Sequence, residues 1–258
     1  MTIPKIIHYC WFGGNEEPDD VKRCICSWKK LCPEYEIFKW DESNFDINCN
    51  EYVKESYQMR KYAFVSDYVR LFALYNYGGI YLDTDVEVIK NLDLLLNQSA
   101  FFGFETEKSI ATCIIGSEQH NDIILDFLNE YQDIHFIVNG KMDMTTNVTK
   151  LTDLLQKKGL KLNNILQMKE EFTVYPIDFF NPKNYKDGKI YITKNTYIIH
   201  HFSGTWQTTE QKKDAYFSRK YGNIGKYYYV IWLLFHSPKK FYEFVIAHIK
   251  KIKRRKFI

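Results

Sequence analysis

Several patterns that would place the chain in a familiar class are missing from its sequence. The chain has 258 residues, and the part before its basic tail contains no internal repeat and no low-complexity linker. Neither a repeat array nor small domains on flexible linkers are therefore expected. The apolar run Tyr227–Phe235 has nine residues and is too short to cross a bilayer. No signal-peptide pattern precedes the strand-like segment that begins at Ile3. We therefore expect a cytoplasmic protein.

The six cysteines lack the paired CxxC spacing that is typical of a structural zinc site. All of them lie in the first 113 residues. In a reducing compartment we expect free and partly buried thiols. A zinc site built from Cys24, Cys26 and Cys32 is the alternative.

Charge is distributed unevenly along the chain. Residues 226–258 hold nine Lys or Arg and one acidic residue, whereas the remainder has 26 basic and 31 acidic residues. We predict one domain over residues 1–225 and a basic, aromatic, amphipathic extension over 226–258. The extension suits an anionic membrane surface, and the alternative is a helix that packs its apolar side on the domain. No recognition motif accompanies the charge, so nucleic acid is not expected as a partner.

The composition, with 45% apolar and 17% aromatic residues, is that of a folded protein. Strand-like and helix-like segments alternate, which favours an α/β layer with a mostly parallel sheet, whose ligands bind beyond the carboxyl ends of the strands. The expected elements are strands at 3–12, 35–40, 80–82, 86–89, 100–104, 110–116 and within 189–202, and helices at 19–32, 60–77, 122–131 and 148–158.

Two aspartates, Asp83 and Asp85, follow the apolar run Ile80–Leu82. In an extended strand, residues i and i+2 point to the same side, so we expect both carboxylates to converge at the strand's carboxyl end. Such a pair attracts a hard divalent cation and leaves coordination positions for the oxygens of a diphosphate. Because a lone Asp-x-Asp occurs by chance in many proteins, the surrounding sequence decides its meaning.

The helix expected over 60–77 ends at Gly78 and Gly79, which are typical helix-stop residues. One of its faces carries Asp67 and Arg70. Residues three apart on a helix are neighbours, so both side chains can reach one spot. A simple salt bridge on the helix is the alternative.

Three ordered blocks of the sequence resemble the DXD sugar-binding glycosyltransferases. The longest runs from Ser66 to Asp85, the first is Ile3–Gly14 and the last is Ile199–Trp206. That family includes bacterial capsular and lipopolysaccharide transferases, the yeast mannosyltransferases that initiate outer chains, and the catalytic domains of large clostridial glucosylating toxins. The blocks span about four-fifths of the chain, and the tail lies outside them.

The resemblance implies a GT-A (Rossmann-like) fold and retaining transfer of a hexose from a nucleotide sugar, a UDP- or GDP-hexose. The acceptor would be a glycan or a lipid-linked saccharide in capsule, lipopolysaccharide or exopolysaccharide synthesis. Residues 1–225 would be the catalytic domain. The protein would work on the inner face of the plasma membrane, held there by its tail.

Carried over by position, the resemblance gives roles to individual residues. Mn²⁺ or Mg²⁺ would be held by Asp83 and Asp85 together with His200, with His201 as the alternative. The residues with a catalytic role would be Asp67, Arg70, Asp83 and Asp85. Those that bind the donor would be Cys10, Trp11, Ser66, Asp67, Arg70, Tyr81, Asp83 and Trp206.

Two other interpretations compete with this one. In a HAD-type phosphatase, Asp83 would be the nucleophile and Asp85 the acid/base, but the later GDxxxD-type acidic pair that such a fold needs is missing from the sequence. A non-catalytic sugar-nucleotide-binding protein at the membrane would bind donor without turnover.

Overall fold

The computed structural model describes residues 2–184, 187–204 and 209–255. The chain forms two compact units, one of Met1–Lys183 with Ile190–Ser203 and one of Asn184–Lys189 with Gly204–Ile258. The boundary expected at residue 225 falls inside the smaller unit, at the start of helix α8 (Gly225–His236). The division into 1–225 and 226–258 stays a prediction.

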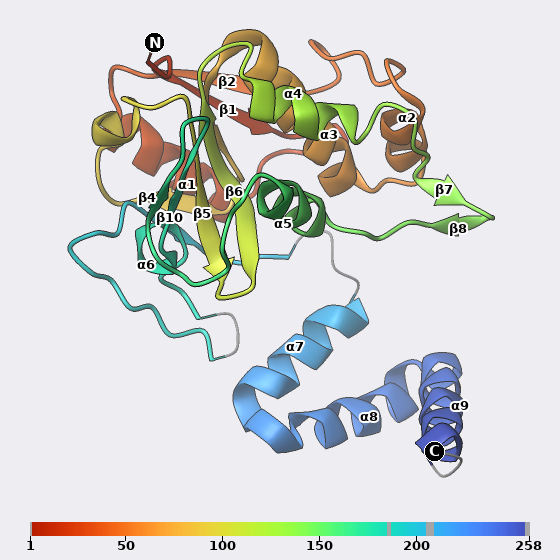
Figure 1. Ribbon diagram of the computed structural model, residues 1–258. Helices are drawn as coiled ribbons and strands as arrows, with labels where there is room; N and C mark the ends of the chain where they lie inside the picture. The colour runs from red at the N-terminus through yellow and green to blue at the C-terminus, as the bar shows by residue number, and fades with distance from the viewer. Residues whose placement is uncertain (1, 185–186, 205–208, 256–258) are drawn as a thin grey trace. The chain divides into compact units, whose positions relative to one another are not determined.

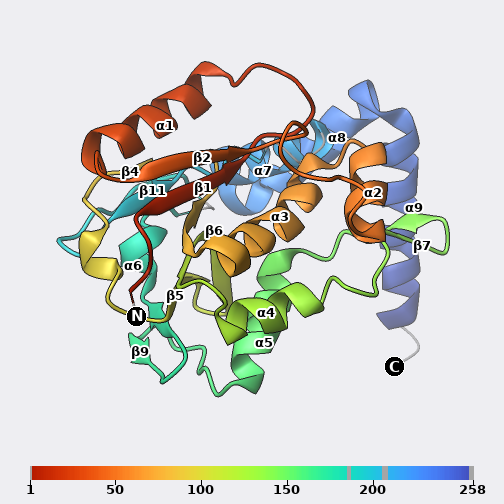
Figure 2. The same cartoon turned by 90° about the horizontal axis from the view of Figure 1, so that it is seen from above.

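A seven-stranded sheet forms the middle of the larger unit (Figures 1 and 2), with strand order β2-β1-β3-β6-β5-β10-β9. Strands β1, β2 and β3 are parallel, β6 is antiparallel to β3 and β5, and β10 is parallel to β5 and antiparallel to β9. All strands except β6 and β9 therefore point the same way, and the expected α/β fold with a mostly parallel sheet is confirmed. The strand bounds are β1 Ile6–Cys10, β2 Glu36–Trp40, β3 Gly79–Leu82, β5 Ala100–Thr106, β6 Ser109–Ser117, β9 Gln167–Met168 and β10 Thr173–Tyr175.

Different helices cover the two faces of this sheet, as Figure 2 shows for α1 on one side and α3, α4 and α5 on the other. One hydrophobic cluster joins α3, α4 and α5 to the sheet, and a second joins α1 to the opposite face. Strand β3 contributes to both, because Tyr81 belongs to the first cluster while Ile80 and Leu82 belong to the second. The helix bounds are α1 Asp19–Leu31, α2 Glu51–Gln58, α3 Tyr62–Tyr77, α4 Asp122–Asn129, α5 Asn147–Lys157 and α6 Ile177–Phe180.

Helix α3 passes directly into strand β3 through Gly78 and Gly79. Their φ angles are 65° and 104°, in the region that favours glycine. A Cβ atom added at Gly79 would lie 2.7 Å from the carbonyl oxygen of Ile6 on strand β1. Only glycine therefore allows β3 to pair with β1 at once, and this short connection fixes where β3 ends.

His8 of strand β1 lies buried beside this connection, with both ring nitrogens hydrogen-bonded. Its Nε2 is 2.8 Å from the carbonyl oxygen of Gly78, and its Nδ1 is 3.2 Å from Trp40 Nε1. A carbonyl only accepts and an indole N–H only donates, so Nε2 carries the proton and the imidazole is neutral. Burial lowers the pKa of His8 to about 4, against the hydrogen bond to Gly78.

We predict that neutral His8 makes the fold sensitive to acid between pH 6.5 and 4. In this window the unfolded imidazole binds a proton that the folded one does not, so stability falls as pH falls, by up to about 3 kcal/mol. Urea unfolding at pH 7 and pH 5 measures this loss. The variant His8→Gln should be less stable at pH 7 yet lose less stability between the two pH values than the wild type. An equal loss in both proteins would contradict the prediction.

The smaller unit is helical, with α7 (Thr209–Tyr221), a 3-10 turn (Gly222–Ile224), α8 and α9 (Pro238–Arg255). Among the residues that the structure describes, no helix is both long and apolar enough to cross a membrane.

Candidate active site

The two aspartates of the DxD motif lie in a turn and not in a strand. Strand β3 ends at Leu82, and the backbone N–H of Val86 donates to the carbonyl oxygen of Asp83 at 3.0 Å, which closes the turn before strand β4 (Val86–Val88). The predicted end of the strand at Leu82 is confirmed, but the strand alternation used to predict that the two carboxylates converge does not apply to this turn. The turn itself brings the side chains of Asp83 and Asp85 together.

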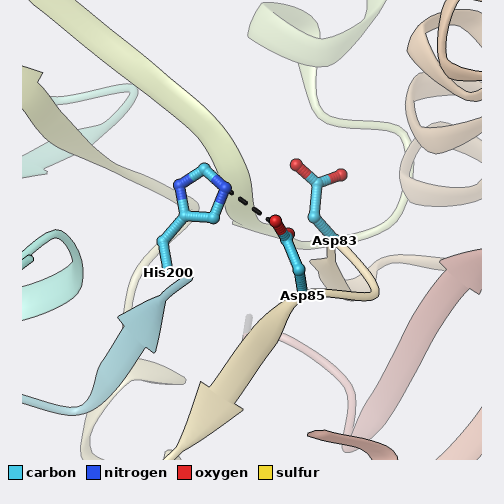
Figure 3. A group of neighbouring side chains, drawn as sticks. All are labelled: Asp83, Asp85 and His200. Atoms are coloured by element: carbon cyan, nitrogen blue, oxygen red, sulfur yellow. Dashed lines mark ion pairs between the residues drawn. The ribbon is translucent and has the colours of Figure 1, made fainter. Parts of the chain in front are cut away.

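His200 reaches the aspartates through a second, two-stranded sheet. Strand β11 (Ile198–His200) pairs antiparallel with β4 so that His200 lies opposite Val86, the residue after Asp85. Figure 3 shows the imidazole directed at the Asp85 carboxylate, with Asp83 beside it, and Nε2 is 3.4 Å from Asp85 Oδ1. One potential ligand atom from each of the three residues lies within 4.8 Å of the other two.

The neighbouring His201 does not join this group. Its Nε2 lies 2.9 Å from the Glu87 carboxylate, and its backbone N–H donates to the carbonyl oxygen of Asp85. Successive residues on a strand point to opposite sides, so only one of the two histidines can face Asp85. The structure brings together Asp83, Asp85 and His200.

Asp85 is held as a carboxylate by its neighbours. Burial raises its pKa, but the hydrogen bond and charge of His200 and the backbone N–H of Ser203, 2.7 Å from Oδ2, outweigh burial and bring the pKa to about 2. Burial lowers the pKa of His200, but Cys113 and Asp85 raise it well above its usual value. The buried Nδ1 of His200 has no hydrogen-bond partner in the described part of the chain.

Arg70 is buried next to the DxD motif, and several protein groups contact its guanidinium. Its Nε donates to the carbonyl oxygen of Ser66 and its Nη1 to that of Thr112, at 3.2 and 2.7 Å. Nη1 is also 3.3 Å from Asp83 Oδ1, and the guanidinium carbon lies 4.5 Å from the centre of the Tyr81 ring. The Tyr81 hydroxyl donates to the same Asp83 oxygen at 3.0 Å. Arg70 and Tyr81 therefore fix the orientation of the Asp83 carboxylate.

A buried chain of polar groups continues from Arg70 into helix α5. Asp67 Oδ1 accepts from Arg70 Nη2 at 2.9 Å and from Asn147 Nδ2 at 2.6 Å, and Asn147 accepts in turn from the Thr112 hydroxyl at 2.9 Å. Burial raises the pKa of Asp67 to about 7 against the charge of Arg70. Both described hydrogen bonds of Asp67 end on Oδ1, which leaves Oδ2 for a ligand.

Three more of the residues expected to bind donor, Cys10, Trp11 and Ser66, lie near the same edge of the sheet. Cys10 is buried at the end of β1, so its side chain is not offered to solvent. Trp11 follows it and is half-buried, with its Nε1 donating to the carbonyl oxygen of Asn15 at 2.7 Å. Ser66 is half-buried and donates to its own helix at Tyr62. Trp206 lies outside the described residues.

Glu105 is a residue at this edge that the sequence did not single out. It lies near the carboxyl end of β5, which points the same way as β1 and β3. Burial raises the pKa of Glu105, while the charge of His200 and the hydroxyl of Ser109 oppose the shift. The sequence could have indicated Glu105, because an acidic residue directly follows the apolar run Ala100–Phe104 and ligands of such sheets bind at strand ends.

The donor atoms at the turn fit a divalent cation. Two carboxylates and one imidazole suit Mn²⁺, and the carboxylates alone admit Mg²⁺ with water. The side chains of Asp83, Asp85 and His200 keep 28%, 17% and 12% of their exposure, so the site is recessed but accessible.

Comparisons with known proteins agree with this geometry. The family described as "Glycosyltransferase sugar-binding region containing DXD motif" matches residues 18–102. "Inositol phosphoceramide mannosyltransferase 3" of Schizosaccharomyces pombe is 35% identical over 128 residues, which are 48% of this chain and 36% of the relative. The "Uncharacterized glycosyltransferase L373" of Acanthamoeba polyphaga mimivirus is 26% identical over 85% of this chain and 90% of its own length. The chain is also similar to the solved "PaToxG Glycosyltransferase", at 18% identity and a TM-score of 0.47 over 61% of this chain and 70% of that structure.

Residues 18–102 therefore resemble the sugar-binding region of the DXD glycosyltransferases, and the expected resemblance is confirmed. Members of the matched family typically bind a divalent metal. The chain spans about a third of the length of the curated mannosyltransferase above. The activity of the whole protein is accordingly a proposal.

We predict that the Arg70 network contributes strongly to stability. The variant Arg70→Met removes the cation that lowers the pKa of Asp67, so this buried carboxyl loses its ion pair and takes up a proton, and the carbonyl oxygens of Ser66 and Thr112 lose a donor. Together these losses should lower the free energy of unfolding by about 3 to 5 kcal/mol. Adding Asp67→Asn replaces the carboxyl group by a neutral amide, so the double variant should be more stable than Arg70→Met alone. Chemical denaturation at pH 7 measures both effects.

A matched control comes from the exposed Lys54–Glu51 pair, which has the same three-residue spacing. Lys54→Met should change stability by less than about 1 kcal/mol. If Arg70→Met costs no more than this control, the network does not support the site as described.

Proposed function

We propose that this protein is a metal-dependent glycosyltransferase that moves a hexose from a nucleotide sugar to an acceptor. The observation that carries the proposal is the convergence of Asp83, Asp85 and His200 beside the carboxyl edge of the parallel strands. This edge is where ligands of α/β sheets bind. The matched sugar-binding region contains the same two aspartates.

In this proposal, Asp83, Asp85 and His200 would hold a divalent cation, which as a Lewis acid would neutralise the charge that develops on the departing diphosphate. Tyr81 and Arg70 keep the Asp83 carboxylate in one orientation, and the backbone N–H of Ser203 does the same for Asp85. Ligands held in advance need no reorganisation when the donor binds. Ser203 also links the motif to the segment that leads to Trp206.

The remaining donor-binding roles follow from position. Trp11 stands at the end of β1 with a partly exposed ring, which suits stacking on the donor base. Oδ2 of Asp67 suits a sugar hydroxyl. Arg70 acts on the sugar chiefly through Asp67 and Asp83, because the protein already occupies most of its N–H groups.

The relatives suggest which donor and acceptor to try first. Several of them bear mannosyltransferase names, among them "Mannosyl phosphorylinositol ceramide synthase SUR1" of Saccharomyces cerevisiae. We propose GDP-mannose as the first donor and a lipid-linked saccharide as the acceptor class. Surface-glycan assembly (capsule, lipopolysaccharide or exopolysaccharide), transfer with retention, the preference for Mn²⁺ and work at the cytoplasmic membrane face are parts of the same proposal.

The competing interpretations fit this site less well. A HAD-type phosphatase needs an Asp83 free to attack phosphorus, but Asp83 Oδ1 is engaged by both Arg70 and Tyr81. It also needs further acids around its metal, and the described residues contain one candidate metal group, with a single histidine as the third ligand. A binding protein without turnover is distinguished by measuring release of nucleoside diphosphate.

We predict that the adjacent histidines differ in their effect on turnover. Nucleoside diphosphate released from the donor with Mn²⁺ should fall at least about a hundredfold in Asp85→Asn and His200→Ala, because each loses a metal ligand. His201→Ala should stay within about threefold of the wild type, because its side chain pairs with Glu87. Circular dichroism checks that all three variants are folded. Equal losses in both histidine variants would contradict this assignment.

A donor screen tests the reaction class. GDP-mannose, UDP-glucose, UDP-galactose and UDP-N-acetylhexosamines are compared for hydrolysis with Mn²⁺, with Mg²⁺ and after chelation by EDTA. We expect one donor to be turned over, with loss of activity on chelation and recovery on adding metal. NMR of the first sugar released should show the donor's anomeric configuration. Release of phosphate from p-nitrophenyl phosphate, without turnover of any nucleotide sugar, would instead support a phosphatase.

A further inference from the structure

Helix α8 of the smaller unit presents an uninterrupted apolar face to solvent. Tyr227, Ile231 and Phe235 are 71%, 55% and 74% exposed, and Leu234 is 45% exposed. At about 100° per residue, these four side chains occupy roughly 100° of the helix circumference, with no charged residue between them. Contiguous apolar surface of this kind marks an interaction site more often than chance.

The opposite side of α8 is already used for packing. Leu233 is buried, and a Cβ atom added at Gly225 would lie 2.2 Å from the carbonyl oxygen of Phe217 on α7. The backbones of the two helices therefore touch on that side. The exposed face is consequently not the side that α8 needs to hold its own unit together.

Basic residues flank the apolar face in the sequence. Lys226 precedes it on α8, and Lys239 and Lys240 open the next helix, all three exposed. Over residues 204–258 the sequence has 13 Lys or Arg and three acidic residues. Apolar and aromatic side chains flanked by such charge match an anionic lipid surface, where rings enter the interface and lysines contact headgroups. A second copy of the chain would bring the same positive charge, which opposes self-association through this face.

We propose that the α8 face, formed by Tyr227, Ile231, Leu234 and Phe235, inserts into the headgroup region of an anionic bilayer. Through this face the protein would contact the membrane at which the proposed function places it. The face would supply apolar contacts with the bilayer, whereas the basic residues 239–258 would supply electrostatic attraction. This contact depends on no step of the transfer chemistry, so either proposal can fail without the other.

The test is sedimentation of the full-length protein with vesicles of phosphatidylcholine alone or with 30% phosphatidylglycerol (about physiological salt). We expect binding to the anionic vesicles and at least about tenfold weaker binding in Ile231→Ser/Phe235→Ser. The matched control is Leu94→Ser/Met168→Ser, which removes two side chains of 75% and 77% exposure from the larger unit. The control should bind like the wild type.

Donor hydrolysis and circular dichroism establish that both double variants are folded, and light scattering gives their oligomeric state. Equal vesicle binding by wild type and the α8 variant would overturn the proposal, as would equal binding to neutral vesicles. So would a wild-type dimer that becomes a monomer in the α8 variant without any vesicle binding. A marked loss of thermal stability in the α8 variant alone would show that the chain itself covers this face, and would also overturn the proposal.

Discussion

The site depends on one buried cation, Arg70. Its guanidinium connects helix α3 to the Thr112 carbonyl on β6 and to the first aspartate of the motif, while it stacks on Tyr81 of β3. A buried guanidinium is tolerated only when its N–H groups are satisfied and its charge is balanced. Asp67 and Asp83 provide the balance, so a structural requirement of the fold also fixes the orientation of a carboxylate that can hold a cation.

Asp85, the second aspartate of the motif, is oriented by different contacts. Asp85 receives a backbone N–H from Ser203 and faces His200, and both come from the segment around β11. Strands β4 and β11 are only three residues long each, yet their pairing places the groups that hold Asp85. A shift of one residue in that pairing would turn His200 away and bring His201 to Asp85. The short β4–β11 sheet is thus what makes the third ligand specific.

The sequence predicted the elements whose signals are local. Helix α3 and strand β3 have a strong apolar pattern, and two glycines mark their junction, so these bounds were found to within about two residues. Helix α2 was missed, because its eight residues mix polar and aromatic side chains without a clear stripe. The turn at Asp83 was also missed, because a backbone hydrogen bond between Val86 and Asp83 closes it and no apolar pattern marks it.

The residues of the candidate site also fall into those that the sequence predicted and those that it did not. Asp83, Asp85, Asp67 and Arg70 were found because they lie close together in the sequence. The choice between His200 and His201 depended on the register of β11 against β4, a contact over more than 110 residues that no local pattern reports. Glu105 and the link from Asn147 to Asp67 were missed for the same reason, as their partners are distant in sequence.

The most direct test of a cation site at the DxD turn is a crystal of the protein soaked with Mn²⁺ and a nucleoside diphosphate, measured at the manganese absorption edge. The account predicts one anomalous peak at bonding distance from the carboxylates of Asp83 and Asp85 and from His200 Nε2, with diphosphate oxygens completing the coordination. A peak elsewhere, or these carboxylates still turned toward Arg70 and Ser203 with no metal between them, would contradict it.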